Sequence, residues 1–111
     1  MDKIEVQKIK QKALEEHIPI IMDDTLEVVD KILTDINPKK ILEIGTAEGY
    51  SAICFSEYLA ENGVIDTIER EEERVIEARK NIKNAGVDEG KHPDDYGKKE
   101  GRQVYPGDYL K

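Results

Sequence analysis

The stretch Ile41-Leu42-Glu43-Ile44-Gly45-Thr46-Ala47-Glu48-Gly49-Tyr50-Ser51 decides the fold of this chain. Its mainly apolar start, which ends at Gly45, is typical of a buried parallel strand, and from Gly49 onward apolar residues recur at helical spacing. Glycines at such a strand-to-helix turn let a ligand approach the backbone, because they have no Cβ atom. The stretch therefore predicts a binding loop between a strand and a helix. For two glycines alone, an ordinary tight connection is the alternative.

Two helices are predicted ahead of this stretch. Sparse apolar positions indicate a helix over residues 2–16, which the segment Ile18-Pro19-Ile20-Ile21 breaks because proline disfavours helical geometry before it. A second amphipathic helix runs over residues 22–36, where Asp24 and Glu27 have the spacing of a capping box.

After this stretch, the pattern of apolar residues predicts a helix, a strand and a second helix. We expect a helix over residues 49–62, a strand over 64–68 and a helix over 71–85 that has acids in its first turn and bases near its end. Strands joined through helices form parallel sheets with right-handed crossovers. The predicted fold class is therefore α/β, a Rossmann-like parallel sheet of two to three strands flanked by helices, with N-terminal helices.

Length and composition predict one domain over residues 1–111. Residues 88–111 are rich in glycine, proline and charge and are predicted to be mainly irregular, with a short third strand at Gln103–Tyr105. The net charge of −8 disfavours nonspecific nucleic-acid binding. A single cysteine, no secretory segment and no apolar run long enough for a bilayer favour a cytoplasmic protein without a membrane partner.

Glu69 strengthens the prediction of a cofactor site. It follows the second strand, so it falls with the glycine turn at the carboxyl ends of the strands, where a carboxylate can accept hydrogen bonds from ribose hydroxyls. The G-x-G-x-x-G fingerprint of dinucleotide sites is absent. Glu43 and Glu48 lie near the turn instead, and such acids tolerate a sulfonium or amino group better than a pyrophosphate.

These residues match a known family. The segments Leu42–Thr46, Gly49–Ser51, Thr67–Arg70 and Ala78–Ile82 closely resemble class I S-adenosylmethionine-dependent O-methyltransferases of the caffeoyl-CoA and catechol type. Within that group the sequence looks most like the bacterial branch that modifies hydroxyuridine in tRNA. The resemblance covers residues 18–87, and its E-x-G-T-x-x-G-Y-S motif is specific.

The resemblance implies S-adenosylmethionine as cofactor and assigns roles to residues of this chain. Ser51 would contact the methionine carboxylate, Glu69 would hold the ribose, and Asp108, in a Gly-Asp pair, resembles the acid that faces the adenine. The residues that would shape the methionine pocket are Glu43, Gly45, Thr46 and Gly49.

The family pattern continues beyond Lys111 into a fourth strand, with aspartates that bind a divalent metal such as Mg²⁺ or orient the acceptor hydroxyl. We therefore expect a chain truncated after the cofactor-binding half. The first strand would then have an open edge, and such edges invite pairing, so a homodimer is one expected partner. By resemblance, residues 2–20 would cover the acceptor; the alternative is a helix that packs on the sheet.

No catalytic residue or metal ligand is assigned. His17 and His92 are isolated, Asp94-Asp95 reads as a solvated loop, and Cys54 reads as a small buried hydrophobe because no base accompanies it. Tyr50 could pack either against the cofactor or in the core.

The first functional hypothesis is methyl transfer to a hydroxyl acceptor, a tRNA hydroxyuridine or a small catechol-like molecule, with this chain as the cofactor-binding fragment. The alternatives are a noncatalytic nucleoside-binding or assembly module and an inactive scaffold.

Overall fold

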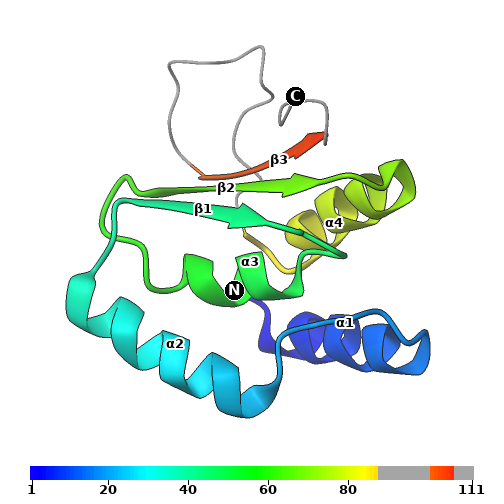
Figure 1. Cartoon of the computed structure of the whole chain (residues 1–111), viewed down its shortest axis with the longest axis horizontal. Coiled ribbons are helices and arrows are strands. Elements are labelled where there is room, and N and C mark those ends of the chain that lie inside the picture. Colours follow the sequence, from blue (N-terminus) through cyan, green and yellow to red (C-terminus); the bar gives the residue numbers. More distant parts are fainter. Residues whose placement is uncertain (88–100, 107–111) are drawn as a thin grey trace.

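The computed structural model describes residues 1–87 and the backbone of residues 101–106. The elements stack in three layers: the sheet, a middle layer of α3 and α4, and an outer layer of α1 and α2 (Figure 1). In chain order they are α1 (Lys3–Glu15), α2 (Asp23–Ile36), β1 (Lys40–Ile44), α3 (Tyr50–Ser56), β2 (Val64–Glu69), α4 (Glu72–Asn84) and β3 (Gly101–Pro106).

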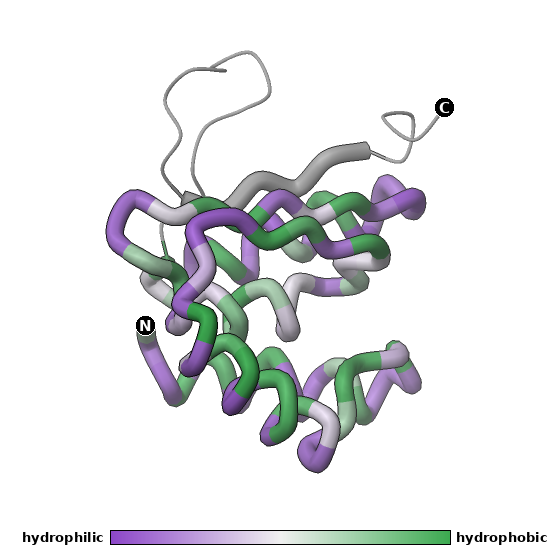
Figure 2. The backbone as a smooth tube through the Cα atoms, turned by 60° about the vertical axis from the view of Figure 1, so that its left-hand side comes forward, coloured by the Kyte–Doolittle hydropathy of each residue, from purple (hydrophilic) through white to green (hydrophobic). Residues whose placement is uncertain are grey.

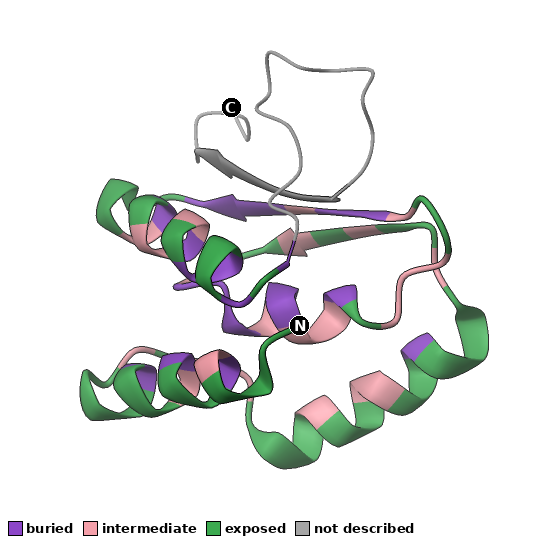
Figure 3. Cartoon of the chain, turned by 180° about the vertical axis from the view of Figure 1, so that it is seen from behind, coloured by how far each residue is buried: buried purple, intermediate pink, exposed green. Residues whose placement is uncertain are grey.

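The sheet has the strand order β1-β2-β3, and both pairings are parallel. Glu43 of β1 lies opposite Thr67 of β2, which in turn lies opposite Val104 of β3. The described helices lie on one side of this sheet (Figures 1 and 3). The predicted α/β fold class is confirmed, and the third strand is longer than the three residues expected for it.

The outer helices begin in different ways. Asp2 caps α1, because its Oδ1 accepts hydrogen bonds from the backbone N–H groups of Ile4 (3.0 Å) and Glu5 (3.2 Å). α2 begins at Asp23, and its N-cap residue Met22 offers no side-chain acceptor. The predicted capping box is wrong: Asp24 lies inside the first turn, where its carboxylate accepts a hydrogen bond from the N–H of Thr25 (2.8 Å).

α3 ends at Ser56, earlier than the predicted residue 62. The backbone continues in tighter turns, since Tyr58 N donates to Phe55 O (3.0 Å) and Leu59 N to Ser56 O (3.4 Å). Ala60 N then donates to Pro38 O (2.7 Å), which ties the chain to the segment before β1. Apolar spacing continues past Ser56, but the backbone changes to these tighter turns before the bond to Pro38.

One buried hydrophobic cluster lies between α1, α3 and α4, and Ile65 and Ile68 of β2 are buried as well. Hydrophobic and hydrophilic residues alternate along the helices turn by turn, as amphipathic packing requires (Figure 2). Buried positions gather where the layers meet (Figure 3). The residues of the cluster between the helices are Val6, Ile9, Tyr50, Ile53, Val75, Ala78, Ile82, Ala85 and Val87.

α1 belongs to this core rather than to a cover over an open site. Asp2 N donates to Ala85 O at 2.6 Å, and Lys12 forms an ion pair with Glu77 of α4 at 2.8 Å. These contacts favour the interpretation of α1 as a packing helix over that of a lid on the acceptor. The helix packs on other helices, however, and not on the sheet. Over residues 1–87 and 101–106, no helix combines the length and the apolar character that crossing a bilayer requires.

Candidate cofactor site

The loop from β1 to α3 contains two glycines with the same backbone geometry and different surroundings. Gly45 and Gly49 both have φ of +92°, which side-chain-bearing residues rarely adopt. A Cβ at Gly45 would meet no atom within 4 Å, whereas one at Gly49 would lie 3.4 Å from the carbonyl oxygen of Ala78 in α4. Gly45 therefore leaves space open beside the loop, while Gly49 allows α4 to approach it.

Backbone hydrogen bonds fix the loop against β2. The N–H groups of Gly45 and Thr46 both donate to the carbonyl oxygen of Ile68, at 2.8 and 3.2 Å. Further along, Asn81 of α4 donates from Nδ2 to the carbonyl oxygen of Glu48 at 2.8 Å. The loop is held from two sides, as a preorganised binding loop needs to be.

Glu69, at the end of β2, links that end of the strand to the loop that follows β1. Its Oε1 accepts from the N–H of Ala47 at 2.7 Å, and its Oε2 accepts from the N–H of Glu71 at 2.9 Å. The side chain is only 6% exposed. Because a carboxylate oxygen can accept two hydrogen bonds, the described residues leave one acceptor site on each oxygen for another donor.

A second polar network lies beneath the loop. Glu43 of β1 accepts a hydrogen bond from Ser51 Oγ at one oxygen and from Thr67 Oγ1, at 2.6 Å, at the other. Since the hydroxyl hydrogen of Thr67 points to Glu43, Thr46 Oγ1 donates to Thr67 Oγ1 across 2.6 Å. The network joins two strands, the loop and α3.

Burial raises the pKa of the Glu43 carboxyl above its usual value, and the hydrogen bonds from Ser51 and Thr67 only partly oppose that rise. The protonated form is thus favoured more than in an exposed glutamate. A raised pKa such as that of Glu43 is typical of residues in functional sites. Hydrogen-bond networks with a purely structural role also shift pKa values.

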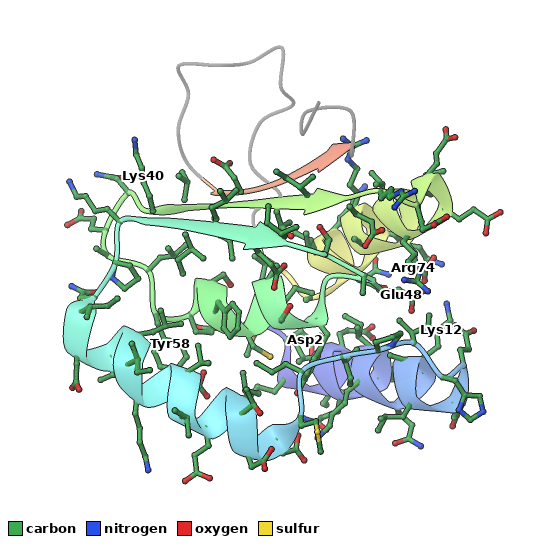
Figure 4. The ribbon with its side chains drawn as sticks, viewed as in Figure 1. Asp2, Lys12, Lys40, Glu48, Tyr58 and Arg74 are labelled. Atoms are coloured by element: carbon green, nitrogen blue, oxygen red, sulfur yellow. The ribbon has the colours of Figure 1, made fainter. Side chains whose placement is uncertain are left out.

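Glu48 is the other acid of the loop, and the charged groups that act on it belong to α1, α4 and the residue after α1. It lies with Lys12 and Arg74 where the loop, α4 and α1 meet (Figure 4). The side chain is 7% exposed, and its Oε1 has no hydrogen-bond partner among the described residues. Burial raises the pKa of Glu48, and the positive charges of Lys12 and Arg74 oppose that rise.

Tyr50 and Cys54, which follow the second glycine in α3, both pack in the core. Tyr50 is buried among core residues, which favours the core interpretation over stacking on a cofactor. Cys54 packs half-buried against the same core, and burial raises the pKa of its thiol to about 11, so the thiol stays protonated at neutral pH.

The remaining predicted positions divide into two groups. His17 is exposed, and no group of three potential metal ligands occurs within the part of the chain that the structure describes. Asp108, His92 and Asp94-Asp95 lie outside the described residues.

Sequence reasoning missed two residues that hold the site. Thr67 and Asn81 were not singled out, yet Thr67 completes the network at Glu43 and Asn81 anchors the loop. Thr67 is a hydroxyl-bearing residue near the carboxyl end of β2, which is the only signal of it in the sequence, because its register opposite Glu43 comes from the structure.

The architecture defines the class of protein: a Rossmann-like α/β domain of the methyltransferase type, with a glycine loop at the carboxyl ends of its strands. An O-methyltransferase from Bacillus cereus, solved in complex with S-adenosylhomocysteine, superposes with a TM-score of 0.75 at 22% identity, covering 99% of this chain and 46% of its own. That likeness shows the fold.

The chain belongs to the protein-L-isoaspartate(D-aspartate) O-methyltransferase family, whose sequence profile matches residues 5–105. A protein-L-isoaspartate O-methyltransferase from Methanococcoides burtonii is 39% identical over 70 residues, 63% of this chain and 31% of the relative. Catechol O-methyltransferase B from Danio rerio is 31% identical over 62 residues, 56% of this chain and 24% of the relative.

The prediction of an S-adenosylmethionine-dependent O-methyltransferase family is confirmed. The chain spans about a third or less of the curated relatives it matches and under half of the solved structure. The tRNA-modifying branch stays a prediction, because these relatives do not determine the acceptor.

Proposed function

We propose that this chain is the cofactor-binding portion of an S-adenosylmethionine-dependent O-methyltransferase. One observation carries the proposal: Glu69 bonds to the N–H of Ala47, so that the acid after β2 and the loop after β1 form one unit beside the open space at Gly45. Ligands of open α/β sheets bind beyond the carboxyl ends of the strands, which is where this unit lies. The single cysteine fits a reducing compartment, so we place the function in the cytoplasm.

The residues present fit the cofactor. Glu69 keeps acceptor sites for ribose hydroxyls, and the polar floor of Glu43, Thr46 and Ser51 suits the amino, carboxylate and sulfonium groups of a methionine moiety. Gly45 would leave room for that moiety, and Gly49 would set the position of α4. Asp108 is proposed as the contact to the adenine.

We propose an oxygen acceptor. When bound, the cofactor supplies a methyl group already activated by its sulfonium, so the protein mainly has to place the acceptor oxygen in line. The finer proposal is a hydroxyl, on a tRNA hydroxyuridine or a small catechol-like molecule. A divalent metal such as Mg²⁺ would assist deprotonation of the acceptor in the full-length family, and we assign none of its ligands to residues 1–87.

A noncatalytic nucleoside-binding module or an inactive scaffold is the second candidate. The internal bonding of the site favours the scaffold, because Glu43, Thr46, Ser51 and Thr67 already bond to one another without a ligand. Such a network can exist purely to hold β1, β2 and α3 together.

Calorimetric titration of S-adenosylmethionine and S-adenosylhomocysteine into the wild-type chain tests the proposal. Glu69→Gln exchanges an acceptor oxygen for a donor, and we expect it to weaken binding at least about tenfold, or about 1.4 kcal/mol. Glu73→Gln, which changes an exposed acid in the first turn of α4, should bind like the wild type.

Saturable binding that only Glu69→Gln weakens would support the cofactor site. A wild-type chain that melts cooperatively and binds neither compound would overturn the proposal and favour the scaffold. Binding without methyl transfer to any tested acceptor would favour the noncatalytic module.

A further inference from the structure

Three hydroxyl groups form a hydrogen-bonded chain that ends at the carboxylate of Glu43. Thr67 Oγ1 donates to one carboxylate oxygen at 2.6 Å, and Ser51 Oγ donates to the other. Thr46 Oγ1 lies 2.6 Å from Thr67 Oγ1 and supplies the donor behind it. Thr46 and Thr67 are 1% and 0% exposed, so bulk water does not reach these two hydroxyls to replace the bonds.

The direction of these bonds depends on the charge of Glu43. When Glu43 is ionised, its oxygens only accept, and the hydroxyl hydrogens run from Thr46 to Thr67 to Glu43. A protonated Glu43 carries a hydrogen of its own, and Thr67 has to turn its hydroxyl away to accept it. The chain therefore stabilises the ionised form, because hydrogen bonds to a charged acceptor are stronger than those to a neutral one.

Burial acts on the same carboxyl in the opposite direction. It is the largest influence on the pKa of Glu43 and raises that pKa, whereas the hydrogen bonds from Ser51 and Thr67 lower it. No charged side chain of the described part of the chain, Glu48 and Glu69 included, is among the causes of the shift. The hydroxyl groups are thus the neighbours that favour a negative charge at this position.

We propose that Thr67 is a positioning residue for the cofactor, whose hydroxyl holds the Glu43 carboxylate in place and ionised so that it attracts the positive groups of the methionine moiety. The inference rests on the proposed function, because it concerns the same site. S-adenosylmethionine carries a sulfonium and an ammonium group, and a neutral carboxyl would lose the charge attraction to both. Thr67 is fully buried and acts through Glu43, without touching the cofactor itself.

Calorimetric titration of S-adenosylmethionine from about pH 5 to about pH 8 tests this role in two matched variants. Thr67→Val keeps the shape of the side chain and removes the hydroxyl, while Thr67→Ser keeps the hydroxyl and removes a methyl group. Without the bond from Thr67, the pKa of Glu43 rises further, so binding is lost at a higher pH. We expect Thr67→Val to bind at least about tenfold more weakly than the wild type at the acid end of the range, with a smaller difference toward the basic end.

The controls separate the hydroxyl from the packing of the strand. Thr67→Ser should follow the pH profile of the wild type, and so should Thr34→Val, which removes a hydroxyl from exposed α2. Thr46→Val removes only the donor behind Thr67, so it should move the profile in the same direction by a smaller amount. This milder variant carries the test if Thr67→Val does not fold.

Carbon-13 NMR titration of the Glu43 carboxyl in the ligand-free chain follows the same effect without the cofactor. A wild-type chain that does not bind S-adenosylmethionine would overturn the proposed function, whatever this titration shows. A pKa of Glu43 that Thr67→Val leaves unchanged, a loss of binding equal at every pH, or a Thr67→Ser profile like that of Thr67→Val would overturn the positioning role.

Discussion

The two sides of β1 differ in how the described chain covers them. On the side toward the helices, Glu43 is bonded to Ser51 and Thr67, which links the strand to α3 and β2. On the far side, Leu42 and Ile44 are largely exposed. The described residues thus supply supports for the loop at the end of β1 but leave Leu42 and Ile44 on its far face exposed. The following changes test this contrast.

Truncation of an isoleucine on the covered face should have the largest effect. Ile65 of β2 is fully buried, so Ile65→Ala should lower the free energy of unfolding by about 2–5 kcal/mol through lost burial and a cavity. Leu42→Ala on the open face should cost less than about 0.5 kcal/mol. Urea unfolding at low protein concentration measures both. Equal losses would contradict the contrast.

Loss of one hydroxyl in the buried network should have a smaller effect. Thr67→Val keeps the shape of the side chain but removes its hydrogen bonds with Glu43 and Thr46, so we expect a loss of about 1–3 kcal/mol. Thr34→Val is the control, because its hydroxyl bonds only within exposed α2, to Asp30 O. If both valine variants unfold at the same urea concentration, the network does not stabilise the strand.

Neutralisation of Glu48 should stabilise the chain by the smallest amount. Its pKa is raised above 4.5 in the folded state, so the folded chain holds the proton to higher pH than the unfolded chain does. Stability from this group is therefore full below about pH 4.5 and falls as the pH rises through the folded pKa. We expect Glu48→Gln to gain about 1 kcal/mol at pH 7 and nothing at low pH.

The difference between the wild-type and Glu48→Gln stability curves isolates this group, because Glu43 titrates in the same direction in both proteins. Chemical unfolding at several pH values gives the curves, and Glu72→Gln on the surface of α4 is the control. If Glu48→Gln stabilises the chain as much at low pH as at pH 7, the buried charge of Glu48 is not the cause of the gain in stability.

Most elements could be predicted from the sequence because their signals are local. Apolar periodicity indicated the four helices and the first two strands, and the glycines marked the turn at the end of β1. The end of α3 could not be predicted in this way, because apolar spacing continues past Ser56 while the backbone tightens into turns and then bonds to Pro38, far away in the sequence.

The site was predictable in residue type and less so in its contacts. Glu69 was expected at the carboxyl end of β2 and lies there, but its bonds to the backbone of Ala47 and Glu71 depend on how the loop folds over β2. The role of Thr67 depends on the register that sets it opposite Glu43, and a single sequence does not contain that register.

Amide NMR of the ¹⁵N-labelled chain during titration with S-adenosylmethionine tests the central claim most directly. The account predicts saturable shifts at Gly45, Thr46, Ala47 and Glu69, while Gly86, a glycine with φ of +71° at the far end of α4, stays unchanged. A folded chain whose spectrum does not respond, or responds only away from the loop and Glu69, would contradict the claim that this loop binds the cofactor.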